Sequence, residues 1–327
     1  MGWVRYLLSF CLALGIMWGG YWFVGAHYID STVNDWFAEQ KAAGLVADNA
    51  GVSVEGFADR FDMTVTSPHL ADPAAGWGWQ APFAQVFAMT WKPWHLIAAL
   101  PHTQVVEVRG EKVTVASTRM MASLLMQPKT GFPPQRLVVE GEGLALNSDA
   151  NWTVGAQKLV LAAENDPTRA GSLHLGADAA NLTLPAAVAN LPDLGPTVSM
   201  VHLDATLALS SPIGWEMEGA QLMGLTVTQL HIIWGSIDLV AQGNVVPDAT
   251  GLASGKINLD LKGWRSLPGV VVALGLVKPD MKVSITRGLE FLAAASPDPQ
   301  VLHLALTLKD GEMSLGPLPL GPAPRLN

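Results

Sequence analysis

Histidines are the first candidates for chemistry in this chain, because histidine binds metals and exchanges protons near neutral pH. None of the eight lies in an H-E-x-x-H pattern or another close metal-ligand spacing, and the only cysteine, Cys11, lies in an apolar N-terminal run. His202 and His303 fall on polar positions of alternating segments, where a solvated role is expected. The sequence therefore predicts no metal site and no cofactor.

Motifs for nucleotide binding and nucleophilic catalysis are incomplete. Gly255-Lys256 resembles a phosphate loop, but that motif needs a glycine at Thr250 and a serine or threonine at Ile257. Gly141-Glu142-Gly143 lacks a third glycine, and no G-x-S-x-G sequence occurs. Three acidic residues fall in predicted turns or on polar strand faces, without a partner to form a catalytic pair: Asp248, Asp260 and Asp310. We therefore expect no enzymatic activity, and an enzyme with an unrecognised site is the alternative.

Tryptophan is abundant, with 12 in the chain, and four of them cluster between residues 77 and 94. One interpretation is packing in the core and at strand edges, since aromatic residues favour strands. The other is an aromatic surface that faces a membrane or a ligand, since tryptophan favours the interface between water and lipid. The candidate residues for an apolar ligand or interface are Trp77, Trp79, Trp91, Trp94 and Trp234.

The N-terminal segment predicts a membrane anchor. Residues 4–26 carry one charge, Arg5, over about the 20 residues that a spanning helix requires. Arg5 lies at the N-terminal end of the segment, acidic residues follow the segment, and the first lysine after it is Lys41, so the positive-inside rule places the N-terminus in the cytoplasm. We expect a single pass through a bacterial inner membrane with the bulk of the chain in the periplasm. The alternative is a cleaved signal peptide, against which bulky Tyr21, Trp22 and Phe23 argue.

Beyond Gly51 the dominant hydrophobic period is two. Apolar and polar residues alternate over 201–209, 257–261 and 302–308, and a turn at Gly110-Glu111 separates two alternating segments. This pattern is typical of antiparallel strands with one apolar and one polar face. The predicted fold is mainly β, with antiparallel, curved or groove-like sheets. Short helices are expected at 31–46, 184–191 and 264–277, the last beginning near Ser266 or Leu267 because of Pro268.

Composition limits the possible partners. The net charge of −9 argues against nucleic acid and against a polybasic attachment to lipid. Only 14% of residues are charged, against about 25% in ordinary soluble domains, so the chain buries or keeps available much apolar surface. We divide it into an anchor (1–28), a juxtamembrane helix (29–48) and a periplasmic β-rich domain (49–327). That domain forms one unit or two subdomains with a break near 165–200.

One stretch and the C-terminus carry a recognisable pattern of structural residues. Trp234-Gly235-Ser236-Ile237-Asp238-Leu239 precedes Ala241-Gln242-Gly243 and Gly255-Lys256-Ile257-Asn258-Leu259, and 308–324 contains Asp310-Gly311 followed by alternating apolar, glycine and proline residues. The chain resembles an uncharacterised alphaproteobacterial envelope family, itself distantly similar to AsmA-like periplasmic proteins. The resemblance implies an anchor before periplasmic β-sheets, and it carries no catalytic residues. Larger AsmA-like proteins are thought to carry lipid along β-grooves, although this chain is much shorter.

Two functional hypotheses follow from these patterns. An uncovered apolar sheet face would form a groove for lipid or another hydrophobic molecule, since removing apolar surface from water is favourable at roughly 25 cal/mol per Å². A sandwich or closed barrel would instead bury its apolar faces against each other. We expect a non-enzymatic envelope protein that binds or helps to move an apolar molecule. The alternative is a structural scaffold or interaction module with envelope proteins as partners at exposed strand edges.

Overall fold

The computed structural model describes residues 2–189, 191, 194–215, 219–273, 275, 277–294, 296, 298–316 and 318–326. It is mainly antiparallel β-sheet, and the predicted fold class is confirmed. The chain forms two compact units: residues 1–132 with 148–150, and residues 133–147 with 151–327. We call these unit 1 and unit 2. The boundaries proposed from the sequence stay predictions.

Unit 1 begins with helix α1 (Gly2–Ala42), which is long and apolar enough to cross a membrane. The short helix expected at 31–46 is the C-terminal part of α1 and not a separate element. Residues 3–18 are exposed, whereas Trp22 and Phe37 are buried against the strands that follow. The apolar N-terminal half of α1 is therefore free, and its second half packs on protein.

The strands of unit 1 form two antiparallel sets. One set pairs β2 (Gly51–Glu55), β3 (Arg60–Thr66), β6 (Phe83–Met89), β7 (Lys92–Leu100) and β10 (Arg119–Met126) in that order. The other pairs β1 (Val46–Asp48), β4 (His69–Asp72), β5 (Trp77–Gln80), β8 (Thr103–Val108) and β9 (Glu111–Ala116). The chain passes between the sets at tight corners, where Ala81 and Ser117 are buried.

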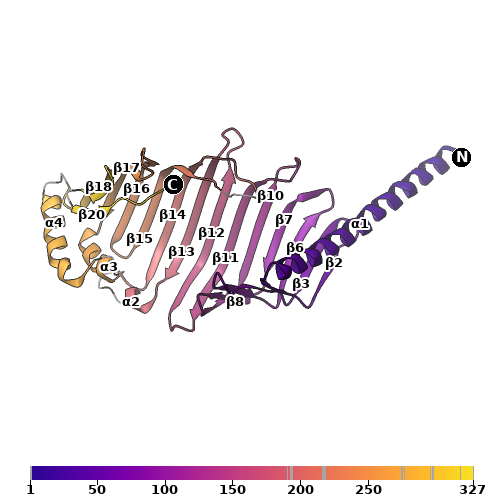
Figure 1. The fold of residues 1–327 in the computed structure, drawn as a ribbon, viewed down its shortest axis with the longest axis horizontal. Helices are drawn as coiled ribbons and strands as arrows, with labels where there is room; N and C mark the ends of the chain where they lie inside the picture. The colour runs from indigo at the N-terminus through magenta and orange to yellow at the C-terminus, as the bar shows by residue number, and fades with distance from the viewer. Residues whose placement is uncertain are drawn as a thin grey trace. The chain divides into compact units, whose positions relative to one another are not determined.

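Unit 2 is an antiparallel meander in which each strand pairs with the next one along the chain, as Figure 1 shows for its longest strands. Its first strands are β11 (Pro134–Ser148), β12 (Thr153–Asn165), β13 (Ser172–Thr183), β14 (Thr197–Leu209), β15 (Leu222–Trp234) and β16 (Ile237–Pro247). They are followed by β17 (Ala253–Lys262), β18 (Val301–Lys309), β19 (Glu312–Leu315) and β20 (Leu318–Pro322). The alternating segments at 201–209, 257–261 and 302–308 all lie in strands, as predicted.

Turn chemistry fixes the hairpins at the positions expected from the sequence. Asp310 and Gly311 join β18 to β19 with φ angles of 53° and 77°. Both values are positive, as in the type I′ turns that match the twist of a two-residue hairpin. Arg109 and Gly110 join β8 to β9 in the same way, with φ angles of 52° and 85°.

Short helices interrupt the meander at two places. Helix α2 (Ala186–Ala189) lies between β13 and β14, and the 3-10 turn η1 (Trp264–Ser266) leads from β17 into α3 (Leu267–Ala273). Helix α3 begins at Leu267, as Pro268 required, because proline is tolerated in the first turn of a helix. The 3-10 turn η2 (Pro279–Met281) and helix α4 (Lys282–Ala294) complete the insertion, and α4 was not predicted.

Candidate functional site

An apolar cavity of about 590 Å³ lies in unit 2 between one face of the sheet and helices α2 and α3. Strands β13 to β19 supply its floor through side chains such as Val201, Leu239 and Leu259. Val188 of α2 and Val270 of α3 supply its cover. Every lining residue is hydrophobic, so the cavity offers carbon surface and no polar group. We call this site the apolar cavity.

The alternating sequence of the strands builds the floor. Val201 pairs with Ile232, Ile232 with Leu239, and Leu239 with Leu261 on successive strands. In register, each apolar side chain stands beside the next on the same face, because side chains of neighbouring strands align across an antiparallel ladder. The floor is thus one continuous row of branched aliphatic groups across β14 to β17.

Among the described residues, the cover is incomplete because helices α2 and α3 are short. Helix α2 has 4 residues and α3 has 7, so neither crosses the width of the strands that they face. Several lining side chains remain only partly buried: Leu182, Leu184, Val201, Ile232, Leu239, Leu259, Leu267 and Leu315. Partial exposure of this row distinguishes the cavity from a sealed packing defect.

One end of the cavity merges with a close-packed core. Trp234 lines the cavity, is 7% exposed, and its indole N–H donates a hydrogen bond of 2.9 Å to the Gly195 carbonyl. Behind it lie Trp264, Leu289 and Leu302, each 1% exposed. Trp264 donates from Nε1 to the Pro299 carbonyl at 3.1 Å. These contacts fix the walls of the cavity and satisfy the polar atoms of both tryptophans.

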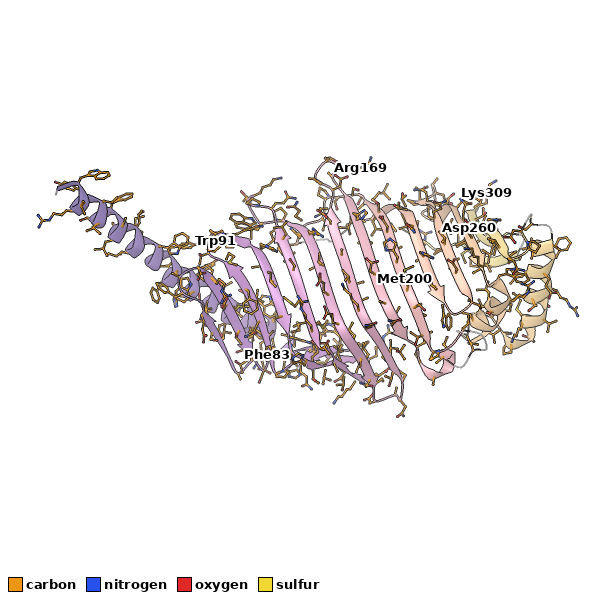
Figure 2. All side chains as sticks on the ribbon, turned by 180° about the vertical axis from the view of Figure 1, so that it is seen from behind. Phe83, Trp91, Arg169, Met200, Asp260 and Lys309 are labelled. Carbon is orange, nitrogen blue, oxygen red and sulfur yellow. The ribbon has the colours of Figure 1, made fainter. Side chains whose placement is uncertain are left out.

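The opposite face of the same strands is polar and carries histidine–aspartate pairs. His202 lies 2.7 Å from Asp178, and His303 of β18 lies 2.6 Å from Asp260 of β17. Asp260 is labelled in Figure 2. The solvated role expected for His202 and His303 fits these exposed pairs, because each side chain meets a neighbouring strand and not a cavity.

Asp238 on this polar face has an altered acidity. Its carboxylate accepts hydrogen bonds from His231 at 2.9 Å and from Lys262 at 3.1 Å. The bond from His231, followed by the bond from Lys262, lowers the pKa of the Asp238 carboxyl. Since Asp238 joins three strands of the sheet, this shift has a structural cause and does not indicate a catalytic acid.

The other candidate tryptophans belong to unit 1. Trp77 and Trp79 of β5 line a hollow of mixed character with residues such as His69 and Glu107, and the Trp79 indole donates to Gln104 Oε1 at 2.6 Å. Trp94 of β7 is partly buried. Trp91 lies in the turn between β6 and β7 and is 56% exposed (Figure 2). The cluster in sequence is therefore spread over different surfaces, and Trp234 alone lines the apolar cavity.

The described lining of the apolar cavity offers hydrophobic surface, whereas a reaction needs a polar or ionisable group aimed at the reacting atom. Within the described part of the chain, no three His, Cys, Asp or Glu side chains gather closely enough to share a metal ion. Sequence reasoning missed most of the lining, although the alternation of apolar residues in β14 to β17 was its signal. The sequence predicted α2 and α3 as short helices but did not indicate that their side chains cover a cavity.

Comparison with known proteins adds one match. The family model of an uncharacterised protein conserved in bacteria (DUF2125) matches residues 22–324. The chain belongs to this family. The match begins at Trp22, inside α1, and covers both units. It confirms the expected membership of an uncharacterised bacterial family. No curated protein and no solved structure matches the chain.

Proposed function

We propose that this member of the DUF2125 family is a membrane-anchored, non-enzymatic protein that binds a lipid acyl chain or a similar apolar molecule in the apolar cavity. The observation that carries the proposal is a lining without a polar atom, in a cavity of about 590 Å³. Ligand pockets typically measure about 300–1,000 Å³. An aliphatic chain gains roughly 0.8 kcal/mol for each CH₂ group that it buries.

The anchor is the second part of the proposal, with the bulk of the chain in the periplasm of a bacterium. Helix α1 has the length and composition of a membrane span. Cleavage of a signal peptide near Ala26 would remove Trp18, Tyr21 and Trp22, whose side chains donate hydrogen bonds to carbonyls of unit 1. Retention of α1 as an anchor keeps these contacts. The distant similarity to AsmA-like proteins agrees with this placement and stays a prediction.

The alternative of a scaffold that docks partners on strand edges has less support. The edge strand β20 of unit 2 contains Pro319 and Pro322. Proline has no backbone N–H to donate, so this edge is poorly suited to pairing with a further strand. An envelope protein partner remains the second candidate, and crosslinking in cells would reveal it.

Filling the cavity tests the proposal. In the variant Leu239→Trp, a larger side chain enters the cavity from β16. The matched control is Val240→Trp, the next residue on the same strand, which faces the polar side beside Asp260. Both variants introduce the same side chain on the same strand, and their unfolding temperatures show whether each protein is folded. The full chain is purified in mild detergent, and native mass spectrometry counts the lipid that stays bound.

The two variants should differ in bound lipid although they share the same anchor. We expect wild type and Val240→Trp to retain one lipid-sized adduct, and Leu239→Trp to lose most of it. Lipid held only around α1 would be equal in all three proteins. Equal adducts in Leu239→Trp and Val240→Trp would therefore refute binding in the apolar cavity.

A further inference from the structure

The described part of α1 that precedes Trp18 is too short to cross a bilayer alone. Residues 3–18 are exposed, and the first hydrogen bond from α1 to a strand connection is that of Trp18. At 1.5 Å per residue, residues 2–17 extend about 24 Å, whereas a hydrocarbon core is about 30 Å thick. A span that begins near Trp3 therefore continues past Trp18 to about residue 22. The contacts of α1 with unit 1 begin inside this span.

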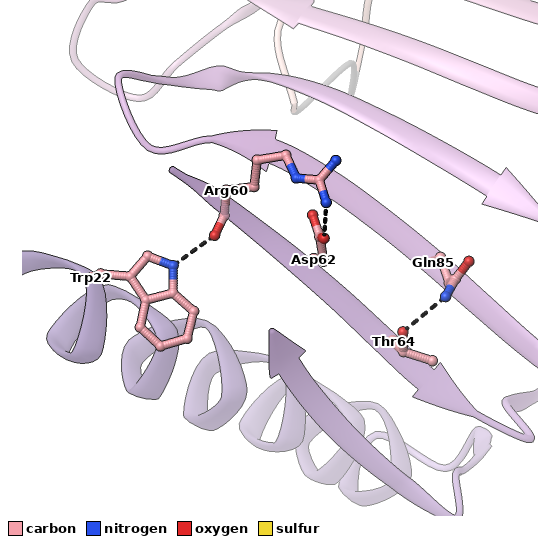
Figure 3. A network of polar contacts seen from close by, with 5 residues as sticks. All are labelled: Trp22, Arg60, Asp62, Thr64 and Gln85. Atoms are coloured by element: carbon pink, nitrogen blue, oxygen red, sulfur yellow. Dashed lines mark hydrogen bonds and ion pairs between the residues drawn. The ribbon is translucent and has the colours of Figure 1, made fainter. Parts of the chain in front are cut away.

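Two turns of unit 1 are attached to this last part of the span. The indole of Trp18 donates to the Ala58 carbonyl at 2.8 Å, and the Tyr21 hydroxyl donates to the Thr90 carbonyl at 2.9 Å. Trp22 donates to the Arg60 carbonyl at 2.6 Å, as Figure 3 shows. Ala58 lies between β2 and β3, and Thr90 lies between β6 and β7. Each bond gives a backbone carbonyl of unit 1 a partner on α1, so these three carbonyls do not depend on water at the membrane surface.

The same turns expose large apolar side chains. Phe57 is 60% exposed and Trp91 is 56% exposed. The Phe57 ring lies 5.4 Å from that of Trp22 and 5.5 Å from that of Phe23, between ring centroids. Aromatic residues from the helix and the β2–β3 turn thus form one surface, of the kind that gathers at membrane interfaces, and Trp91 directly follows Thr90, to which Tyr21 of the helix donates.

Charged residues fix the depth of this surface. Asp59 and Arg60 lie two and three residues after Phe57, and Lys92 directly follows Trp91. Asp59 and Arg60 are exposed, and the Arg60 guanidinium lies 2.8 Å from Asp62 (Figure 3). Such groups suit the headgroup region and are costly in hydrocarbon. The turns therefore belong at the boundary between headgroups and acyl chains, with only Phe57 and Trp91 reaching the chains.

We propose that the β2–β3 and β6–β7 turns insert into the leaflet nearest unit 1, with the lipid bilayer itself covering Phe57 and Trp91. This inference rests on α1 crossing a membrane and is independent of the apolar cavity. Unit 1 is then held directly against the membrane surface through three aromatic hydrogen bonds to α1. The last turns of the membrane span thus lie in the bilayer and also pack against the turns of unit 1.

Single-cysteine labelling of the full chain tests this insertion. Cys11, the only native cysteine, lies in the exposed half of α1 and reports on the anchor. In a Cys11→Ser background, Phe57→Cys and Trp91→Cys place a label on each turn. The control Ala74→Cys places it on the exposed turn between β4 and β5. The wild-type chain is labelled with the fluorophore NBD at Cys11, and each variant is labelled at its single introduced cysteine. All four proteins are reconstituted in vesicles of phosphatidylethanolamine and phosphatidylglycerol.

Quenchers on either side of the interface locate each label. We expect a lipid with a 5-doxyl group to quench the labels at 57 and 91 at least twofold more than the label at 74. Aqueous iodide should show the reverse order. If the labels at 57 and 91 match the label at 74 while Cys11 is protected from iodide, the turns lie in water and the proposal is wrong. If iodide also reaches Cys11, the anchor itself has failed, and the proposal fails with it.

Discussion

The two units cover their apolar sheet faces in different ways. In unit 1, the long helix α1 lays Trp22 and Phe37 on the strands, and both side chains are nearly fully buried. In unit 2, the covering helices α2 and α3 have 4 and 7 residues, and an apolar cavity of about 590 Å³ remains beside them. A sheet with one apolar face needs a second layer, and the length of that layer decides whether space is left for a guest.

Removal of Trp264 should break unit 2 without affecting unit 1. This side chain is 1% exposed and carries the hydrogen bond to Pro299. We expect Trp264→Ala to destabilise the protein by about 3–5 kcal/mol, the usual cost of deleting a buried aromatic side chain. Hydrogen exchange should then accelerate in β15 to β18 and stay slow in β2 and β3. Trp77→Ala, at a residue 41% exposed in unit 1, is the control and should change little.

A milder change should weaken only the attachment of α1 in unit 1. Trp22→Phe keeps an aromatic ring against Phe61 but removes the N–H that donates to the Arg60 carbonyl. The loss of one such hydrogen bond costs about 1 kcal/mol. Exchange should rise in peptides covering residues 56–60, and the lipid bound in unit 2 should be unchanged. Loss of that lipid in this variant would show that the packing of α1 in unit 1 affects the apolar cavity of unit 2.

The smallest expected effect concerns pH and the polar face of unit 2. The pKa of Asp238 is lowered by hydrogen bonds from His231 and Lys262. A lowered pKa in the folded state means that the stabilisation is present above about pH 4, the value for an unfolded aspartate. It is lost as pH falls through the lower folded value.

Asp238→Asn isolates this contribution. The unfolding temperature of the variant should lie below that of wild type at pH 6, with a difference in free energy of at most about 1 kcal/mol because the group is partly exposed to solvent. The difference should shrink at pH 3. A stability difference between wild type and Asp238→Asn that grows as the pH falls would contradict the assigned cause of the lowered pKa.

Strand positions in unit 2 were predictable because hydrophobic alternation, turn residues and proline all indicate the same elements there. Alternation placed Val201 to Leu209 on two faces, and Asp310-Gly311 supplied residues that accept positive φ. Pro268 likewise fixed the start of α3, since its ring excludes the residue from a helix interior. These signals involve residues close in sequence, so each can be read without knowledge of the fold.

The open sheet and its cavity depend on contacts that are distant in sequence. The groove and the closed core share one alternating pattern, and the helices that pack on the strands of unit 2 determine how much of the apolar face is covered. The continuity of α1 was missed because the apolar run ends near Ala26 and Ser31 or Thr32 resembles the cap of a second helix. The tryptophans between 77 and 94 were grouped by sequence, whereas strand pairing sends them to different surfaces.

Photo-crosslinking tests the binding of an apolar molecule in unit 2 most directly. The full chain in membranes is incubated with a fatty acid that carries a diazirine near the end of its chain, and modified peptides are identified by mass spectrometry after irradiation. Our account predicts adducts on peptides that contain Trp234, Leu239 or Leu259, and their loss in Leu239→Trp. Adducts confined to α1, with none in β14 to β18, would contradict it.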